Sequence, residues 1–305
     1  MSHKLSLNDG VLMPTLAFGV GTAFLKRSGS DALHRPTVDA VKEALRVGYR
    51  HLDTAEMYNT ELEVGAAIHE SIAEGIVQGR DELFITTKVS SDFLNISKSI
   101  DVSLQKLKLD YVDAYLIHTP YWAESDDDLQ KAWKGMEEVK ASGKARTIGV
   151  SNFQSTHLRT VLATAQTPPS VNQLEFHPYL SVRDGNDYLF SLRDNMRDIT
   201  ISAYGALAPI TRNIPGPLDE TLKEVANRYG VGTDLVCLRW CIEQGVATIT
   251  TSRHEDRMKG YLRVFDFQIT PDEVMQIGAS AQACLGDKEQ PLTRIEKYHM
   301  AQKHT

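Results

Sequence analysis

Short apolar runs alternate along the chain with segments whose apolar residues recur every three or four positions. The short runs are bounded by turn-forming residues, as is typical of strands buried in a parallel sheet. We expect eight such strands, at 16–19, 49–52, 84–87, 114–117, 147–150, 171–174, 199–203 and 247–250.

The segments between these runs have the spacing of amphipathic helices, which pack one face on a core. Gly48 follows the first of them and marks its end. Residues 270–273 (TPDE) combine an N-terminal capping box with proline at the first helical position. The apolar positions of the five clearest helices are Val38, Val41 and Leu45; Ile96, Ile100, Leu104 and Leu107; Leu129, Trp133 and Met136; Leu158, Val161 and Leu162; and Leu218, Leu222 and Val225.

These alternations predict one closed α/β barrel rather than an open sheet. Eight strand and helix units over about 250 residues, with no long linker, are typical of a (β/α)8 TIM barrel. Residues 8–10 (NDG) are expected to form the turn of an N-terminal hairpin within residues 1–14. The competing dinucleotide-binding sheet would need Gly-x-Gly-x-x-Gly, of which Gly19 and Gly21 supply only the first two glycines. We therefore predict a single domain over residues 1–305.

The charge and hydropathy of the chain exclude several kinds of partner. The net charge is -7, whereas nucleic-acid binding needs a basic surface. No apolar run approaches the roughly 20 residues that cross a bilayer. The first eight residues lack the apolar core of a secretory signal. We expect a cytoplasmic protein that binds neither nucleic acid nor membrane.

Two clusters have structural explanations that we favour over chemical ones. Cys237 and Cys241, two of only three cysteines, lie four residues apart on an expected helix, where free cysteine usually packs as a small hydrophobe rather than serving redox chemistry. The acidic run 126–128 (DDD) is most simply a solvated helix start. It lacks the pattern of a calcium loop, so we do not expect a metal there.

Polar side chains stand at the ends of three successive expected strands. Asp53 ends the second strand, Lys88 the third and His118 the fourth, and Tyr58 lies in the loop after the second. Taken singly, these could be a helix cap, a rim charge and a buried histidine. In a barrel, however, catalytic side chains project from the carboxyl ends of strands. Their joint placement predicts that they meet at one barrel mouth.

This set of side chains suits the reduction of a carbonyl group. When hydride adds to C=O, negative charge grows on oxygen, and a phenol such as Tyr58 can donate a proton once its pKa of about 10 is brought closer to working pH. The Lys88 ammonium would lower that pKa, and Asp53 would keep the lysine charged and in place. His118 would hydrogen-bond the carbonyl oxygen and orient it. Tyr58 and His118 are thus also predicted substrate contacts.

Five further segments of the chain carry a family pattern in a fixed order. They are 48–55 (GYRHLDTA) with Tyr58 and Gly65, 109–118 (LDYVDAYLIH), 148–153 (IGVSNF), 172–178 (NQLEFHP) and 265–267 (FDF). In these segments the chain resembles the aldo-keto reductase family. The resemblance implies a (β/α)8 barrel, a nicotinamide dinucleotide as hydride donor, an aldehyde or ketone as substrate, and no metal. It also implies the catalytic tetrad Asp53, Tyr58, Lys88 and His118.

The resemblance also implies a set of cofactor contacts. Ser151, Asn152 and Gln173 match the residues that bond the nicotinamide carboxamide, and Tyr204 matches the aromatic that stacks on its ring. Without the resemblance, strand-end caps and a core tyrosine would explain them. Further implied cofactor contacts are Asp53, Gly21 and Thr22 in the loop after the first strand, and Gly205 and Leu207 in the loop that resembles the family's cover over the pyrophosphate.

The segment after the eighth strand departs from the family pattern. The family typically has Pro-Lys-Ser and a later Arg that hold the adenosine 2'-phosphate, and residues 250–257 here read TTSRHEDR. We expect Thr250, Thr251, Ser252, Arg253 and Arg257 to contact the cofactor, with the two arginines replacing the lost lysine at a helix start. This favours NADPH over NADH.

The same variant segment is similar to a fungal branch that reduces conjugated polyketones and α-keto amides, which implies activated dicarbonyl substrates. Phe24, Tyr121 and Trp122 are aromatic residues on loops at the same mouth. They are candidate walls of an apolar substrate pocket, although plain packing would also explain them. In related barrels the C-terminal tail, here 282–305, adds a wall near the mouth. We expect a small-molecule carbonyl substrate and a monomer or weak dimer.

Two other readings of the sequence stay open. A metal-dependent hydrolase on the same barrel could use Asp53, His118 and His177 as ligands, but it would usually show a paired His-x-His, which is absent. A redox-sensing or structural barrel could hold the dinucleotide with little turnover, and the complete tetrad counts against it.

Overall fold

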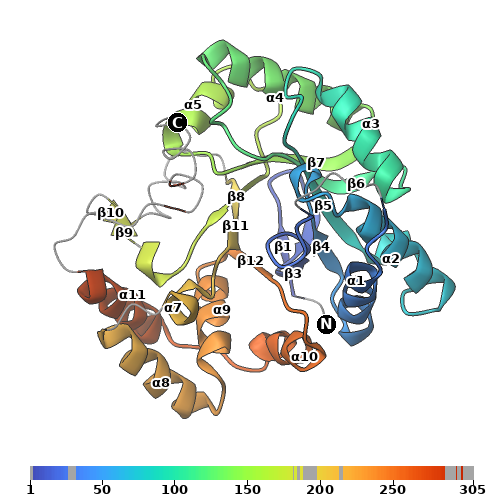
Figure 1. Cartoon of the computed structure of the whole chain (residues 1–305). Coiled ribbons are helices and arrows are strands. Elements are labelled where there is room, and N and C mark those ends of the chain that lie inside the picture. Colours follow the sequence, from blue (N-terminus) through green and yellow to red (C-terminus); the bar gives the residue numbers. More distant parts are fainter. Residues whose placement is uncertain are drawn as a thin grey trace.

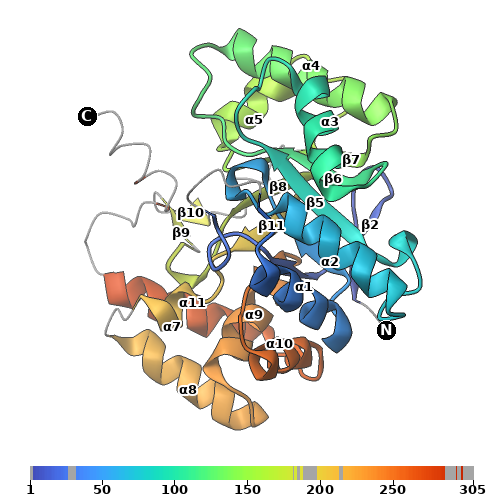
Figure 2. The same ribbon diagram turned by 45° about the vertical axis from the view of Figure 1, so that its right-hand side comes forward.

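Eight parallel strands in the described part of the chain close into a barrel surrounded by helices (Figures 1 and 2). This computed structural model describes residues 3–26, 32–180, 182–183, 186–187, 198–212, 216–285, 293 and 297. All eight predicted strands are confirmed. They are β3 (Leu16–Gly19), β4 (His51–Asp53), β5 (Phe84–Val89), β6 (Val112–Ile117), β7 (Ala145–Ser151), β8 (Val171–Glu175), β11 (Thr200–Tyr204) and β12 (Ala247–Thr250), and β12 pairs with β3 to close the barrel.

Helices lie outside the strands and bury their apolar faces against them, as the spacing predicted. None of the described helices is long and apolar enough to span a membrane. Their bounds are α1 (Arg35–Val47), α2 (Glu61–Ala73), α3 (Ile96–Leu107), α4 (Asp126–Ala141), α5 (Ser155–Leu162), α7 (Ala208–Thr211), α8 (Pro217–Tyr229), α9 (Thr233–Glu243), α10 (Glu255–Leu262) and α11 (Pro271–Leu285), with short 3-10 turns η1 (Glu56–Tyr58), η2 (Arg80–Glu82), η3 (Pro178–Leu180) and η4 (Arg263–Phe265).

Local signals in the sequence set several helix ends. Gly48 follows α1 with φ of 121°, a conformation that favours glycine. Thr270 and Glu273 exchange hydrogen bonds as a capping box at the start of α11. The acidic run 126–128 begins α4 behind the cap Ser125, which confirms the helix-start interpretation.

The N-terminal hairpin covers the end of the barrel at which the strands begin. It consists of β1 (Lys4–Ser6) and β2 (Leu12–Pro14), which pair as predicted around the turn at 8–10. Leu7 and Met13 pack in one cluster with residues from the starts of strands, among them Phe84 and Ala247. Since this end is filled by apolar packing, a ligand site is left to the opposite end. A second two-stranded ribbon consists of β9 (Val182–Arg183) and β10 (Asn186–Asp187).

The register of the barrel strands brings the predicted catalytic side chains to one face. Asp53 pairs with Thr86, and Lys88 lies two residues beyond Thr86. Lys88 pairs with Leu116, and His118 lies two residues beyond Leu116. Paired residues of neighbouring strands, and residues two apart on one strand, face the same side of a sheet. All three side chains therefore point into the barrel at its carboxyl end.

Cys237 and Cys241 are fully buried in α9, which agrees with a packing role. Burial raises the pKa of the Cys241 thiol well above its ordinary value, so the reactive thiolate is disfavoured. The tail from residue 286 onward, apart from residues 293 and 297, lies outside the described residues. The prediction that this tail lies near the barrel mouth therefore concerns residues outside the described part of the chain.

Candidate active site

A buried ion pair lies at the centre of the carboxyl end of the barrel. Lys88 Nζ lies 2.8 Å from Asp53 Oδ1 and donates a second bond of 2.8 Å to the carbonyl of Thr54. Gln173 Nε2 donates to the other carboxylate oxygen, Asp53 Oδ2, at 2.7 Å. Lys88 has no exposed surface. Such a pair is tolerated only because each charge is neutralised and hydrogen-bonded.

Tyr58 reaches this pair from the 3-10 turn η1. The Lys88 ammonium lies 5.1 Å from the centroid of the Tyr58 ring, and the Tyr58 hydroxyl lies 3.4 Å from His118 Nε2. The loop after β3 comes so close that a Cβ on Gly21 would lie 2.9 Å from the Tyr58 ring. A larger residue at position 21 would displace the Tyr58 ring, so glycine allows this ring to lie beside Asp53, Lys88 and His118. The structure brings all four predicted catalytic residues together.

The balance of effects on the Tyr58 hydroxyl differs from the sequence expectation. Loss of solvent around the hydroxyl raises its pKa, and the Lys88 charge opposes this increase without overcoming it. The net pKa is therefore above the ordinary value, and the expectation of a net lowering is wrong for the protein alone. The direction of the Lys88 effect is as expected. A raised pKa keeps the phenol protonated, as a proton donor requires.

Lys88 is held as an ammonium. Burial alone would lower its pKa, but the charge of Asp53, and then Tyr58, outweigh the loss of solvent and leave the pKa above its ordinary value. The positive charge beside the Tyr58 ring is thus permanent at physiological pH. It stabilises any negative charge that develops on the phenol oxygen.

His118 is neutral. Burial and the nearby Lys88 charge lower its pKa from 6.5 to about 3. Its Nδ1 lies 2.7 Å from the hydroxyl of Ser90, and its backbone carbonyl accepts a bond of 2.9 Å from Asn152 Nδ2. A neutral imidazole can donate one hydrogen bond to a carbonyl oxygen without adding a charge to the site.

The depressed pKa of His118 predicts an acid-dependent loss of stability. Between pH 6.5 and 3 the His118 imidazole is protonated in the unfolded chain but neutral in the folded chain. The free energy of unfolding therefore falls as pH falls. Between pH 6.5 and 5 the wild type should lose about 1.5 kcal/mol more than His118→Gln. Urea unfolding at both pH values measures this, with His69→Gln, at an exposed site, as the matched control. Equal losses in the wild type and His118→Gln would contradict the assignment.

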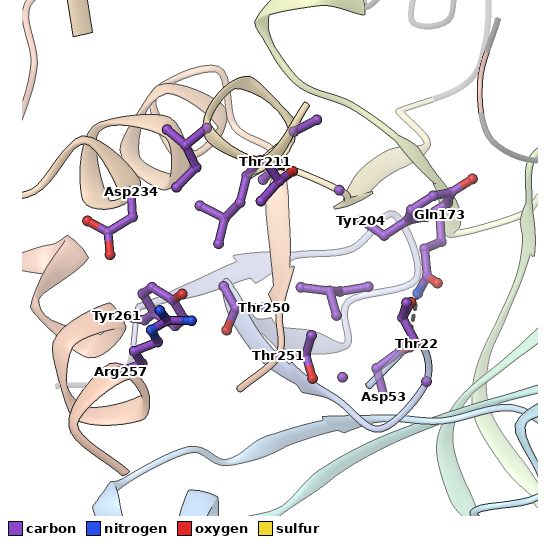
Figure 3. A pocket seen from close by; sticks show the side chains of 18 of the residues that line it. Thr22, Asp53, Gln173, Tyr204, Thr211, Asp234, Thr250, Thr251, Arg257 and Tyr261 are labelled. Atoms are coloured by element: carbon purple, nitrogen blue, oxygen red, sulfur yellow. Dashed lines mark hydrogen bonds between the residues drawn. The ribbon is translucent and has the colours of Figure 1, made fainter. Parts of the chain in front are cut away.

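A cavity of about 710 Å³ opens over the tetrad and extends along the barrel mouth (Figure 3). At one end it contacts Asp53, Tyr58 and His118; at the other, Arg257 and Tyr261. All but two of the predicted cofactor residues line it. A ligand that fills this cavity would have one part beside Asp53, Tyr58 and His118 and another part beside Arg257.

The predicted nicotinamide contacts form one hydrogen-bonded network beside the tetrad. Ser151 donates to the Gln173 carbonyl at 2.7 Å, and Asn152 Nδ2 donates to Ser151 Oγ at 3.0 Å. The Tyr204 hydroxyl donates to Asn152 Oδ1 at 2.8 Å. Asn152 holds this place with a φ of 62°, which asparagine tolerates better than most residues. The side chains that would meet a carboxamide are thus pre-positioned.

The donor set fits a nicotinamide dinucleotide. The amide nitrogen of Gln173 donates its hydrogen bond to Asp53, so the amide oxygen of Gln173 can accept a hydrogen bond from a carboxamide. Farther along the cavity wall, Thr251 Oγ1 is buried with no hydrogen-bond partner among the described residues. A buried hydroxyl without a partner is costly unless a ligand satisfies it. Arg257 adds a cation at the far end.

Ser252 and Arg253, the two exceptions, do not line this cavity. Ser252 Oγ accepts a bond of 3.0 Å from the His254 backbone N–H, just before α10 begins. The Arg253 guanidinium donates to the carbonyl of Ala23 and lies 5.7 Å from the centroid of the Phe24 ring. In this arrangement Arg253 fastens the loop after β3, and Arg257 is the arginine of the pair that faces the cavity.

The predicted substrate aromatics lie outside the wall of this cavity. Phe24 is buried against Phe18 at a ring distance of 6.0 Å. Trp122 stacks on Phe93 with centroids 4.4 Å apart, and Tyr121 packs edge-on against His157. Their contact with a substrate remains a prediction.

Sequence reasoning missed the support of the loop after β11. Glu175, at the end of β8, is fully buried and accepts a hydrogen bond from Arg212, just beyond α7. Gly205, with φ of 73°, passes so close that a Cβ would lie 3.2 Å from Glu175 Cγ. The pair holds the loop that carries Leu207 along the cavity wall. Only the position of Glu175 two residues after Gln173 hinted at this inward direction.

The metal-site reading finds no support in the described part of the chain. Asp53 is engaged by Lys88 and Gln173, and no group of three His, Cys, Asp or Glu side chains there could hold a metal ion.

The structure is thus a TIM barrel with Asp53, Lys88 and His118 at its strand ends and Tyr58 in the turn after β4. A model of the aldo/keto reductase family matches residues 17–282, and the chain belongs to this family.

Relatives and a solved structure agree with this assignment. An "NAD/NADP-dependent indole-3-acetaldehyde reductase" of Schizosaccharomyces pombe is 36% identical, over 88% of this chain and 92% of that protein. An "NADPH-dependent alpha-keto amide reductase" of Saccharomyces cerevisiae is 35% identical, over 89% and 88%. The crystal structure of a Bombyx mori aldo-keto reductase in complex with NADP superposes with a TM-score of 0.79, at 31% identity, covering 95% of this chain and 98% of that one.

Proposed function

We propose that the chain is an NADPH-dependent carbonyl reductase that acts on activated ketones and dicarbonyls. The observation that carries the proposal is the Tyr58, Lys88, Asp53 and His118 cluster at one end of a cavity that also contacts Ser151, Asn152 and Gln173. The expected location is the cytoplasm, and the expected form a monomer or weak dimer.

In the proposed reaction the chain's own residues handle the proton and the orientation of the substrate. When bound, a nicotinamide dinucleotide would supply the hydride for the carbonyl carbon. Tyr58 gives its phenolic proton to the carbonyl oxygen, so that C=O becomes CH–OH. Lys88 stabilises the phenolate left behind, and Asp53 holds Lys88 in place. His118, neutral beside Tyr58, donates a hydrogen bond to the same oxygen and fixes the approach of the substrate.

Arg257 is proposed to favour NADPH by pairing with the 2'-phosphate. Asp234 lies at the same end of the cavity as Arg257 (Figure 3), so its negative charge partly offsets the positive charge of the arginine. The pKa of Tyr261 reflects both charges: burial raises it most, Asp234 raises it further, and Arg257 lowers it. This opposing charge supports a preference for NADPH that is not absolute. The printed name of the fission yeast relative, which includes both NAD and NADP, is in line with such a preference.

Replacing Arg257 with Ala should weaken NADPH binding by about 10 to 100-fold, because a hydrogen bond to a charged group contributes about 1.5–3 kcal/mol. NADH affinity should change by less than about twofold. Fluorescence titration with both cofactors measures this. Arg263→Ala is the control, since Arg263 is exposed, pairs with Asp266 and does not line the cavity. Equal losses for NADPH and NADH in Arg257→Ala would contradict the assignment.

The preference for activated carbonyls rests on the segment 250–252 (TTS) and on the yeast relative whose name specifies α-keto amides. The test follows oxidation of NADPH and, in parallel, NADH with an aromatic aldehyde, an α-keto ester, a cyclic vicinal diketone and an aldose. Fast turnover of the diketone and the keto ester with NADPH supports the proposal. Faster turnover of the aldose contradicts the substrate class. No turnover, with both cofactors bound, favours the dinucleotide-binding barrel of little activity.

A further inference from the structure

Ser90 contacts the side of His118 that the proposed reaction leaves unused. Ser90 follows β5 directly, two residues after Lys88, and its hydroxyl lies 2.7 Å from His118 Nδ1. The other ring nitrogen, Nε2, faces the Tyr58 hydroxyl at 3.4 Å. His118 is thus bounded on one side by the proton donor and on the other by a serine.

The chemistry of a neutral imidazole makes this contact important. It carries one N–H, so one ring nitrogen donates and the other accepts. To donate to a carbonyl oxygen beside Tyr58, His118 must carry its proton on Nε2, and Nδ1 must then be the acceptor. A hydroxyl that donates to Nδ1 stabilises this tautomer, whereas the same hydroxyl turned to accept from Nδ1–H would stabilise the other one, so the direction of the Ser90 bond decides which nitrogen of His118 faces the substrate as a donor.

The position of Ser90 is itself fixed from the turn that carries Tyr58. The Ser90 backbone N–H donates to Glu56 Oε2 at 2.7 Å, and that of Ser91 donates to the same oxygen at 3.2 Å. Ser91 Oγ donates to the other oxygen, Glu56 Oε1. Glu56 begins the 3-10 turn η1 that ends at Tyr58. One carboxylate therefore ties the loop of Ser90 to the turn of the proton donor.

The backbone of His118 is held as well. Its N–H donates to the Val89 carbonyl at 3.1 Å, directly before Ser90, and its carbonyl accepts from Asn152. The ring stands nearly perpendicular to that of Tyr58, at 86°. The backbones of both residues are therefore anchored beside each other.

We propose that Ser90 is a positioning residue that donates a hydrogen bond to His118 Nδ1 and so keeps the ring proton on Nε2, aimed at the substrate oxygen. Its consequence for turnover rests on the proposed function. The tautomer itself is a property of the protein before any substrate binds, and it can be tested separately.

The first test is nitrogen NMR of 15N-histidine-labelled full-length protein at pH 7, with the His118 signals assigned by their absence in His118→Asn. In the wild type, His118 should show a protonated Nε2 and an unprotonated Nδ1. Ser90→Thr, which keeps a hydroxyl, should retain this pattern, and Ser90→Ala should show both tautomers. A wild-type proton on Nδ1, or a single unchanged tautomer in Ser90→Ala, overturns the proposal.

The second test is kinetic, with the best substrate of the carbonyl panel. Ser90→Ala should lower kcat about tenfold, as expected for loss of one hydrogen bond, with KM for the carbonyl changed less. Ser90→Thr should stay within about twofold of the wild type. Ser91→Ala is the matched control, because Ser91 shares the Glu56 anchor and its hydroxyl bonds Glu56.

A fall in Ser91→Ala equal to that in Ser90→Ala would mean that loop anchoring matters and the tautomer does not, which overturns the proposal. If no carbonyl is reduced at all, the proposed function fails, and the NMR result still decides the role of Ser90. If Ser90→Ala does not fold, the wild-type spectrum alone can overturn the proposal through a proton on Nδ1.

Discussion

Replacing Tyr58 with Phe should lower kcat by about 100 to 10,000-fold, the range that positioned proton transfer contributes. The variant should keep its cofactor affinity, because the lost hydroxyl faces His118 at 3.4 Å, and the ring that packs against Gly21 remains. Stability should change by less than about 1 kcal/mol, as for one long hydrogen bond. Steady-state kinetics, NADPH titration and urea unfolding measure the three quantities.

Tyr111→Phe is the matched control for Tyr58→Phe. Tyr111 lies before β6, at the end of the barrel where the strands begin, and its ring packs under Arg80. It should retain wild-type kcat. Wild-type turnover in Tyr58→Phe would remove Tyr58 from the mechanism. A parallel loss of cofactor affinity would mean that the ring and hydroxyl serve binding instead.

Replacing Lys88 with Met should cost about 3–5 kcal/mol of stability, because it leaves the Asp53 carboxylate buried without its charge partner. Turnover should fall by at least about 100-fold, since Tyr58 loses the ammonium that stabilises its phenolate. Lys131→Met is the control, because the exposed pair of Lys131 with Asp127 contributes at most about 1 kcal/mol.

The double variant Asp53→Asn with Lys88→Met separates the two effects. It removes both charges, so much of the lost stability should return. Turnover should stay as low as in Lys88→Met, because no ammonium faces Tyr58. If the double variant regains turnover, Lys88 acts only in stability. If Lys88→Met unfolds no more easily than the wild type, the buried pair does not contribute as the structure implies.

The places where residues lie could be predicted well, because they follow from local patterns. Asp53, Lys88 and His118 each end a strand whose apolar run is visible in the sequence, and parallel strands align their carboxyl ends. Short sequence signals also set the ends of α1 and α11, through Gly48 and the capping box at 270–273.

The pKa values and the side-chain contacts of these residues could not be predicted in the same way. The pKa of Tyr58 depends on the loss of solvent against the Lys88 charge, and the structure gives this balance the opposite sign to the expectation. Arg253 and Arg257 look alike in the sequence, yet one is engaged by Ala23 and the other faces the cavity. Ser90 gives no sequence signal, because its partner His118 is 28 residues away.

The sequence by itself determined the barrel, its order of strands and helices, the family, and the four side chains that meet at the barrel mouth. Apolar periodicity and strand-end position are local, and each strand reaches the barrel mouth at a position that its own run defines. Only the tertiary structure decided which nitrogen of His118 meets Ser90, which arginine reaches the cavity, and whether solvent or Lys88 prevails at Tyr58. Those outcomes depend on distances and burial between segments far apart in the chain, which a one-dimensional pattern does not contain.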